Sequence, residues 1–374
     1  MRKLASVLRE AWLILGVTLV WLIVLEIAAQ AAFAARDVWR AGGGAQLAER
    51  SLGADVYRDQ AWATEYWREE NLTSQNTFAD WHSYVYWRRN PYQGKYINID
   101  ANGLRQTWNA TPTPTHVKIF MFGGSALWGT GARDEFTIPS WLSKKLHARG
   151  AEVRVTNFGE GGYVSTQQVI ALMLELQKGN VPDVVVFYDG VNDTFSAFQQ
   201  GVAGIPQNEY HRARSFNQLN WRDQVVEKLA LYRAARGAVA AWRKPAPRDD
   251  AALAQAVVQT ALNNYALVAA LAKQYGFTAQ FYWQPAIYSK PILSAWEKQE
   301  FNRHGEADFF RQTYRAFTQQ TSARAMGDVY DLSNAFDAEA NTVFIDAWHI
   351  SEAGNARIAE LMAQTLLPLI PRGR

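Results

Sequence analysis

Between residues 116 and 283 the sequence alternates short apolar runs with longer segments in which apolar residues recur at helical spacing. The apolar runs predict strands at 116–122, 153–156, 183–188 and 277–283. The longer segments predict helices at 138–149, 165–178 and 251–275, the last ending before Gly276. Such alternation is typical of a parallel sheet covered by helices on both faces. We therefore predict an α/β fold, a three-layer sandwich with a central parallel sheet.

The first 35 residues have a different pattern. Every residue from 11 to 25 is apolar, Gly or Thr, and the apolar run continues less cleanly to Ala35. This length is sufficient to cross a bilayer, and basic residues precede the run at Arg2, Lys3 and Arg9. We predict an uncleaved, single-pass transmembrane anchor within residues 1–40, with the rest of the chain extracytoplasmic (periplasmic). The alternative is a signal peptide cleaved near residues 32–34, followed by secretion.

Composition and charge exclude several classes of protein. The chain is 48% hydrophobic and 20% charged, which is not the composition of a disordered protein. Its formal net charge of +3 and the lack of a basic stripe predict no nucleic-acid partner. The sequence contains no cysteine, so disulfides and thiolate metal sites are excluded. We expect no metal and no other cofactor.

Four short blocks follow one another in the last two thirds of the chain. They read Gly-Gly-Ser at 123–125, Asn-Phe-Gly-Glu-Gly-Gly at 157–162, Gly-Val-Asn-Asp at 190–193 and Asp-Ala-Trp-His at 346–349. Together they contain what acyl transfer requires: a hydroxyl nucleophile, a backbone N–H donor, an amide donor, and an imidazole with a carboxylate to orient it. Each block alone is equally typical of a turn, and the second could bind phosphate through its amides. Their conjunction at predicted strand ends, where ligands of such sheets bind, favours a catalytic site.

The four blocks resemble those of the SGNH (GDSL-like) hydrolases over roughly residues 117–367. The resemblance implies a flavodoxin-like sheet and assigns roles to five residues. Ser125 would be the nucleophile, His349 the base and Asp346 its orienting carboxylate, with Ser125, Gly162 and Asn192 forming the oxyanion hole.

Two details of this resemblance concern glycines. The family's oxyanion glycine falls five residues after the asparagine of its block, which selects Gly162 over Gly159 and Gly161. Gly124 stands where the name-giving motif has aspartate, a variation that many members carry. Residues 96–105 resemble the segment that leads into the catalytic core of membrane-anchored members.

The remaining regions lie before and within the predicted catalytic domain, which we place at residues 116–374. Residues 41–115 form an aromatic-rich extension and linker, whose rings stack on sugars or, more commonly, pack against the main domain. An insertion at about 195–250 is either a lid over the site or a solvated helix followed by a loop.

The sequence therefore predicts a serine esterase that removes acyl groups, most plausibly O-acetyl, from an exported polysaccharide or cell-envelope glycan. The alternatives are an O-acyltransferase acting on the same glycan class and a non-catalytic glycan-binding module of the same fold. A lipase or thioesterase is less favoured, because no long apolar stretch outside the anchor indicates an acyl-chain tunnel. The expected partners are an acylated carbohydrate or other ester and, through the N-terminal helix, a membrane.

Overall fold

Five parallel strands form the central sheet of the protein, in the order β6-β5-β7-β8-β9. The computed structural model describes residues 2–74, 78–111, 116–217, 226, 228–242, 248–303, 305–324 and 326–370. The strands are β5 (Val117–Gly123), β6 (Val153–Asn157), β7 (Val184–Asp189), β8 (Thr278–Trp283) and β9 (Val329–Asp331). Every residue of β7 is buried, as its continuous apolar run predicts for a strand covered on both faces.

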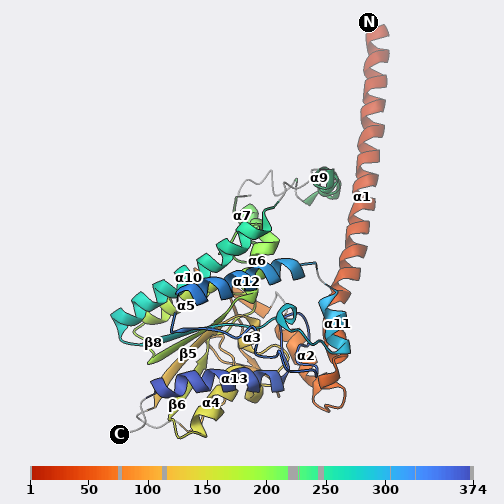
Figure 1. The fold of residues 1–374 in the computed structure, drawn as a ribbon. Helices are drawn as coiled ribbons and strands as arrows, with labels where there is room; N and C mark the ends of the chain where they lie inside the picture. The colour runs from red at the N-terminus through yellow and green to blue at the C-terminus, as the bar shows by residue number, and fades with distance from the viewer. Residues whose placement is uncertain are drawn as a thin grey trace. The chain divides into compact units, whose positions relative to one another are not determined.

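Helices cover both faces of this sheet (Figure 1). On one face lie α4 (Ile138–His147) and α13 (Glu352–Leu366), and on the other α5 (Ser165–Gln177), α10 (Asp250–Tyr275) and α12 (Ala307–Arg324). Thr137 and Asp249 cap the N-termini of α4 and α10, and Gly276 ends α10 in the left-handed conformation. The predicted α/β fold with a central parallel sheet is confirmed.

Shorter elements complete this compact unit, which comprises residues 48–209 and 249–374. Three short helices are α3 (Ser125–Trp128), α6 (Val191–Gln200) and α11 (Ala295–Phe301), and the 3₁₀ helices are Asp55–Tyr57, Asp134–Phe136, Ile287–Ser289 and Leu367–Leu369. The strand register pairs Met121 with Asn157 and Gly123 with Tyr188. The ends of β5, β6 and β7 therefore meet at one edge, with the first three sequence blocks directly after them.

The aromatic-rich extension folds onto the same unit. It contains α2 (Ala63–Thr73), the hairpin β1 (Ala79–His82) with β2 (Tyr86–Arg89), and the hairpin β3 (Tyr92–Gln93) with β4 (Asn98–Ile99). Tyr66 is buried and its hydroxyl accepts a hydrogen bond from the Gly131 amide at 2.8 Å. Trp81 and Tyr84, by contrast, are 69% and 73% exposed on the first hairpin. Part of the extension thus packs as core, and part presents rings to solvent.

A second unit comprises residues 1–47 and 210–248. Its helices are α1 (Arg2–Leu52), which extends beyond the unit, α7 (Glu209–Asn217) and α9 (Ala230–Trp242). Within α1, Arg9–Arg36 has a mean hydropathy of 2.3 and the length of a membrane span or of a signal sequence. The Glu26 carboxylate accepts hydrogen bonds from the Ala230 and Leu231 amides at 2.5 and 2.9 Å. It thereby caps the first turn of α9, where N–H groups lack partners within the helix.

Candidate active site

Ser125 lies at the point where β5 turns into helix α3. Gly123 ends the strand, Gly124 is extended, and Ser125 is the first residue of the helix. The turn leaves no room for a side chain at position 124, because a Cβ atom there would lie 2.1 Å from the Asn192 Nδ2 atom. A glycine at position 124 therefore allows Asn192 to pack directly beside the serine's turn.

The His349 ring joins Ser125 to Asp346. Its Nε2 atom lies 2.7 Å from the Ser125 Oγ atom, and its Nδ1 atom lies 2.6 Å from the Asp346 Oδ2 atom. The other carboxylate oxygen of Asp346 accepts hydrogen bonds from the backbone amides of Trp348 and His349 at 2.9 and 2.8 Å. One carboxylate thus both shapes the turn and holds the ring.

The charge of Asp346 is stabilised where it lies. Burial alone would raise the pKa of this carboxyl. The His349 ring and the hydrogen bonds from the ring and two backbone amides lower the pKa, and together they outweigh the effect of burial. The net pKa lies below the ordinary value. An ionised Asp346 accepts a hydrogen bond from the Nδ1–H group of His349. The proton therefore stays on Nδ1, and the lone pair of Nε2 is directed at the serine hydroxyl.

The glycine-containing loop after β6 provides three backbone amides. The Gly159 amide donates to the Asn157 Oδ1 atom and the Gly161 amide to the Glu160 Oε1 atom, both at 2.9 Å. The Gly162 amide has no acceptor among the described residues, and Gly162 has a φ of +77°, a conformation that favours glycine. Of the three, only the Gly162 amide is therefore available to a ligand within the described part of the chain.

Asn192 lies at the start of α6 and borders both the serine turn and the glycine loop. Its Nδ2 atom donates to the Tyr163 carbonyl at 2.8 Å, which fixes the orientation of the amide. The amide has two hydrogens, so a second remains for another acceptor. The structure therefore gathers Ser125, His349, Asp346 and Asn192 at one edge of the sheet, with Gly162 adjacent to Tyr163.

Two buried carboxylates lie beneath this edge. Asp193 accepts hydrogen bonds from the Ser165 amide at 3.1 Å and the Ser165 hydroxyl at 2.6 Å. Burial raises the pKa of Asp193 to about 6, despite the opposing hydrogen bonds from Ser165. Burial, followed by repulsion from Asp193, also raises the pKa of the neighbouring Asp189. Asp189 and Asp193 thus form a pair of buried, interacting carboxyl groups, and Asp193 directly follows Asn192 in the sequence.

The extension contributes contacts that the four blocks do not reveal. The Trp87 Nε1 atom donates to the Gly161 carbonyl at 3.0 Å, and the Arg89 guanidinium pairs with Glu160 at 3.4 Å. A Cβ atom at Gly162 would lie 3.5 Å from the Trp87 ring. The only signal of these residues in the sequence is the aromatic density of residues 41–115. Strand β2 thus packs against the glycine loop and holds it through Gly161 and Glu160.

Across the residues that the structure describes, no cluster of three or more His, Asp or Glu side chains has a metal-binding arrangement.

No protein-family model matches the sequence, and no curated protein matches it either. Among solved structures, an acetyl xylan esterase is similar at 16% identity and a TM-score of 0.41, over 67% of this chain and all of that one. A putative lipolytic protein of the G-D-S-L family from Desulfitobacterium hafniense covers the same shares at 10% identity and a TM-score of 0.38. The lipase/acylhydrolase from Enterococcus faecalis has 13% identity and a TM-score of 0.39 over 69% and 99%.

Proposed function

We propose that the protein is a serine ester hydrolase of the SGNH type. The observation that carries this proposal is the unbroken hydrogen-bonded chain from Ser125 through His349 to Asp346, at the carboxyl edge of a parallel sheet. In such a chain the histidine can remove the hydroxyl proton, and the carboxylate stabilises the imidazolium that forms. A purely structural turn has no need of a half-buried serine hydroxyl hydrogen-bonded to a histidine.

The reaction follows from this arrangement in two steps. The Ser125 Oγ atom bonds to the acyl carbon while its proton moves to the His349 Nε2 atom. The carbonyl oxygen becomes an oxyanion, which accepts hydrogen bonds from the Ser125 and Gly162 amides and the Asn192 Nδ2 atom. The ester C–O bond then breaks, and His349 returns its proton to the leaving alcohol. Water, deprotonated by the same histidine, releases the acyl group as a carboxylic acid and restores Ser125.

The substrate we propose is an acylated, most plausibly O-acetylated, polysaccharide outside the cytoplasm. Arg9–Arg36 has the composition of a membrane anchor or signal sequence, and both would export the catalytic unit. The exposed Trp81 and Tyr84 rings present flat apolar faces, on which sugar rings can stack. Transfer of the acyl group to a sugar hydroxyl instead of water would use the same acyl-enzyme, and makes an O-acyltransferase the alternative.

A substrate panel tests the proposal. Full-length protein in detergent is assayed with nitrophenyl esters of increasing chain length and with acetylated oligosaccharides, with and without an unacetylated acceptor. We expect release of acetate with a preference for short acyl groups, and loss of activity in Ser125→Ala but not in the exposed-hairpin control Ser83→Ala. Acyl transfer to the acceptor without net acetate release would establish the transferase. Equal rates for Ser125→Ala and the unaltered protein would refute the assigned nucleophile.

Location is tested separately. A fusion of alkaline phosphatase after Arg374 should be enzymatically active, because this enzyme matures only outside the cytoplasm. Membrane protein that resists salt and alkali and keeps its first residues would identify an anchor, and a soluble form beginning near Ala35 would identify a cleaved signal. An inactive fusion would contradict the proposed exported substrate.

A further inference from the structure

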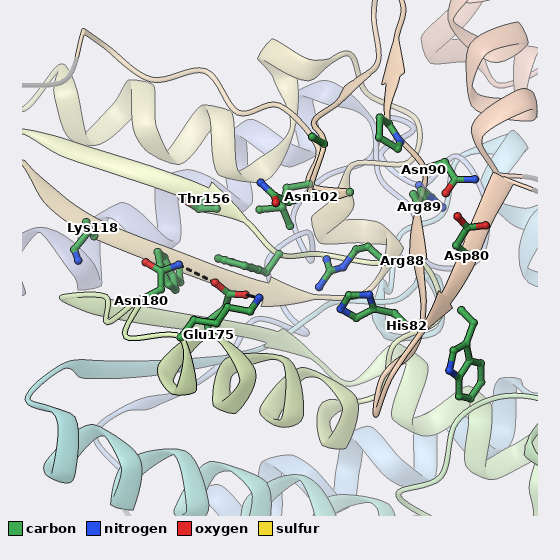
Figure 2. A pocket seen from close by; sticks show the side chains of 18 of the residues that line it. Asp80, His82, Arg88, Arg89, Asn90, Asn102, Lys118, Thr156, Glu175 and Asn180 are labelled. Atoms are coloured by element: carbon green, nitrogen blue, oxygen red, sulfur yellow. Dashed lines mark hydrogen bonds and ion pairs between the residues drawn. The ribbon is translucent and has the colours of Figure 1, made fainter.

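A polar cavity lies along the edge of the sheet formed by β6, under the first hairpin of the extension (Figure 2). Its volume is about 660 Å³, within the range typical of ligand sites. Its charged lining is mostly basic: five cationic side chains (Arg88, Arg89, Lys118, Arg154, Lys178) face two carboxylates (Asp80, Glu175). Figure 2 shows Arg88 and His82 extending into the cavity from the hairpin, opposite Glu175 and Asn180.

Three of these cations have an anionic or carbonyl partner, whereas Arg88, whose guanidinium lies 5.9 Å from the centre of the Tyr163 ring, and Arg154 have neither in the described structure. Lys178 pairs with Glu175 at 2.6 Å, Arg89 pairs with Glu160, and the Lys118 Nζ atom donates to the Val181 carbonyl. Within the described residues, Arg88 and Arg154 form no ion pair. With Lys118, which forms no ion pair in the described structure either, they outnumber the one carboxylate of the lining without an ion pair, Asp80, which stands opposite Arg88 in the hairpin register. The cavity therefore carries an excess of positive charge.

Arg88 and its neighbour Arg89 both carry a buried donor without an acceptor. The Nη1 atom of each has no hydrogen-bond partner among the described residues, and Arg88, unlike Arg89, forms no ion pair there either. The Arg88 side chain is held in place, because Gly103 packs so closely that a Cβ atom there would lie 2.4 Å from the Arg88 Cγ atom. A buried donor without an acceptor is costly, and a fixed guanidinium is preorganised for a two-oxygen anion.

His82, beside Arg88 in the cavity lining, has a lowered pKa. Partial burial lowers the pKa of His82, and repulsion from Arg88 and Lys178 lowers it further, against a smaller opposing effect of Glu175. His82 therefore does not supply a further positive charge at neutral pH, and can act as a neutral hydrogen-bonding group beside Arg88.

We propose that this cavity binds a carboxylate of an acidic polysaccharide, with Arg88 as its principal ligand and Arg154 as a supporting charge. That the anion belongs to a carbohydrate rests on the proposed function. The lining supports it, since the amides of Asn90 and Asn102 and the exposed Trp81 ring supply the contacts that sugar hydroxyls and ring faces use.

Residues of strand β2 both line this cavity and contact the glycine loop. Strand β2 carries Arg88 into the cavity, while its neighbours Trp87 and Arg89 hold the glycine loop that contains the Gly162 amide. An acidic unit bound at Arg88 would therefore hold one part of the polymer against the same strand that supports the proposed oxyanion site. Charge on the polymer, rather than the acyl group, would then provide much of the affinity for the substrate.

The test measures binding without turnover. Full-length Ser125→Ala protein in detergent is titrated calorimetrically with oligogalacturonate and with a neutral galacto-oligosaccharide of equal length. We expect the acidic oligomer to bind more tightly, with an affinity that falls as salt rises. Arg88→Gln should weaken its binding about tenfold or more, with little change for the neutral oligomer. The matched control Arg68→Gln removes an exposed arginine outside the cavity and should have no effect.

A second variant covers the case in which Arg88→Gln fails to fold. Arg154 is exposed on the edge strand, and Arg154→Glu should weaken acidic-oligomer binding about tenfold while the melting temperature stays unchanged. Equal affinity for acidic and neutral oligomers, or unaltered binding in both variants, would overturn the proposal. Full competition by inorganic phosphate at equal molarity would overturn it too, by identifying a site for free anions. Absence of esterase activity would refute the proposed function but leave this binding result intact.

Discussion

The turn at residues 346–349 and the glycine loop at residues 157–162 are positioned in different ways. Asp346 and His349 hold each other and their own turn through contacts within four consecutive residues. The glycine loop has local bonds of its own, but it is also held by Trp87 and Arg89, which are more than 70 residues away in the sequence. A short motif therefore suffices to orient the proposed base, whereas the proposed oxyanion site also has support from the extension. The same extension borders the proposed carbohydrate cavity.

The largest effect is expected where the local turn is altered. Asp346→Asn keeps the shape of the side chain but favours the wrong histidine tautomer, so kcat on a short-chain ester should fall by about 10⁴-fold. Steady-state kinetics with matched circular dichroism would measure this. A loss below about tenfold would show that Asp346 shapes the turn without orienting the ring for catalysis.

Asn192 lies between the serine turn and the glycine loop, because it packs against Gly124 and donates to the Tyr163 carbonyl directly after the loop. Asn192→Ala should lower kcat by about 10²- to 10³-fold with little change in KM, since its amide is proposed to meet a charge that develops only in the transition state. Initial-rate measurements on the same ester test this. Unchanged turnover would assign Asn192 to a structural turn.

Beneath the site, Asp193 should make stability depend on pH. Its pKa rises from 3.8 in the unfolded chain to about 6, so the folded protein binds the proton more tightly. The stabilisation is complete below the unfolded pKa and is lost as pH rises through about 6, on the order of 2–3 kcal/mol.

Denaturant unfolding between pH 4 and pH 7 measures this loss. Asp193→Asn should make the profile less steep, with the remaining slope due to Asp189, and the exposed control Asp308→Asn should leave it unchanged. A profile equally steep in Asp193→Asn would assign the pH dependence to other groups.

The smallest expected effect on kcat concerns the extension, through the contact of Trp87 with the glycine loop. Trp87→Phe keeps the ring but removes its hydrogen bond to the Gly161 carbonyl, which is worth about 0.5–1.5 kcal/mol. We expect kcat on a small ester to fall by about two- to tenfold with KM nearly unchanged. The exposed Trp81 makes no such bond in the described structure, and a small ester has no sugar ring to stack on it, so Trp81→Phe is the matched control for this substrate. A rise in KM alone would show that Trp87 contacts substrate and does not position the loop.

The sequence was most informative where a pattern is local. The parallel sheet follows from apolar runs such as the buried strand β7, and these predicted strands match within a residue or two. Strand β9 has only three half-buried residues, too few for a pattern, and was not predicted. The hairpin of β1 and β2 was also missed. Its aromatic residues are too dense to give an alternating pattern, and the glycine loop against which it packs lies more than 70 residues further along the chain.

The candidate site likewise has residues that the sequence predicts and contacts that it does not. The four blocks identified residues that the structure brings to one edge, although their catalytic roles stay predictions. Neither the support by Trp87 nor the unpaired donor of Arg88 has a local signature, because each depends on contacts between distant segments.

Covalent labelling of Ser125 tests the central claim most directly. A fluorophosphonate probe reacts with serines that a neighbouring base activates. The full-length protein should bind one probe molecule, located at Ser125 by peptide mass spectrometry, and labelling should be abolished in Ser125→Ala and strongly slowed in His349→Ala. Labelling of the Ser125→Ala protein at an unchanged rate would contradict the assignment of Ser125 as the nucleophile.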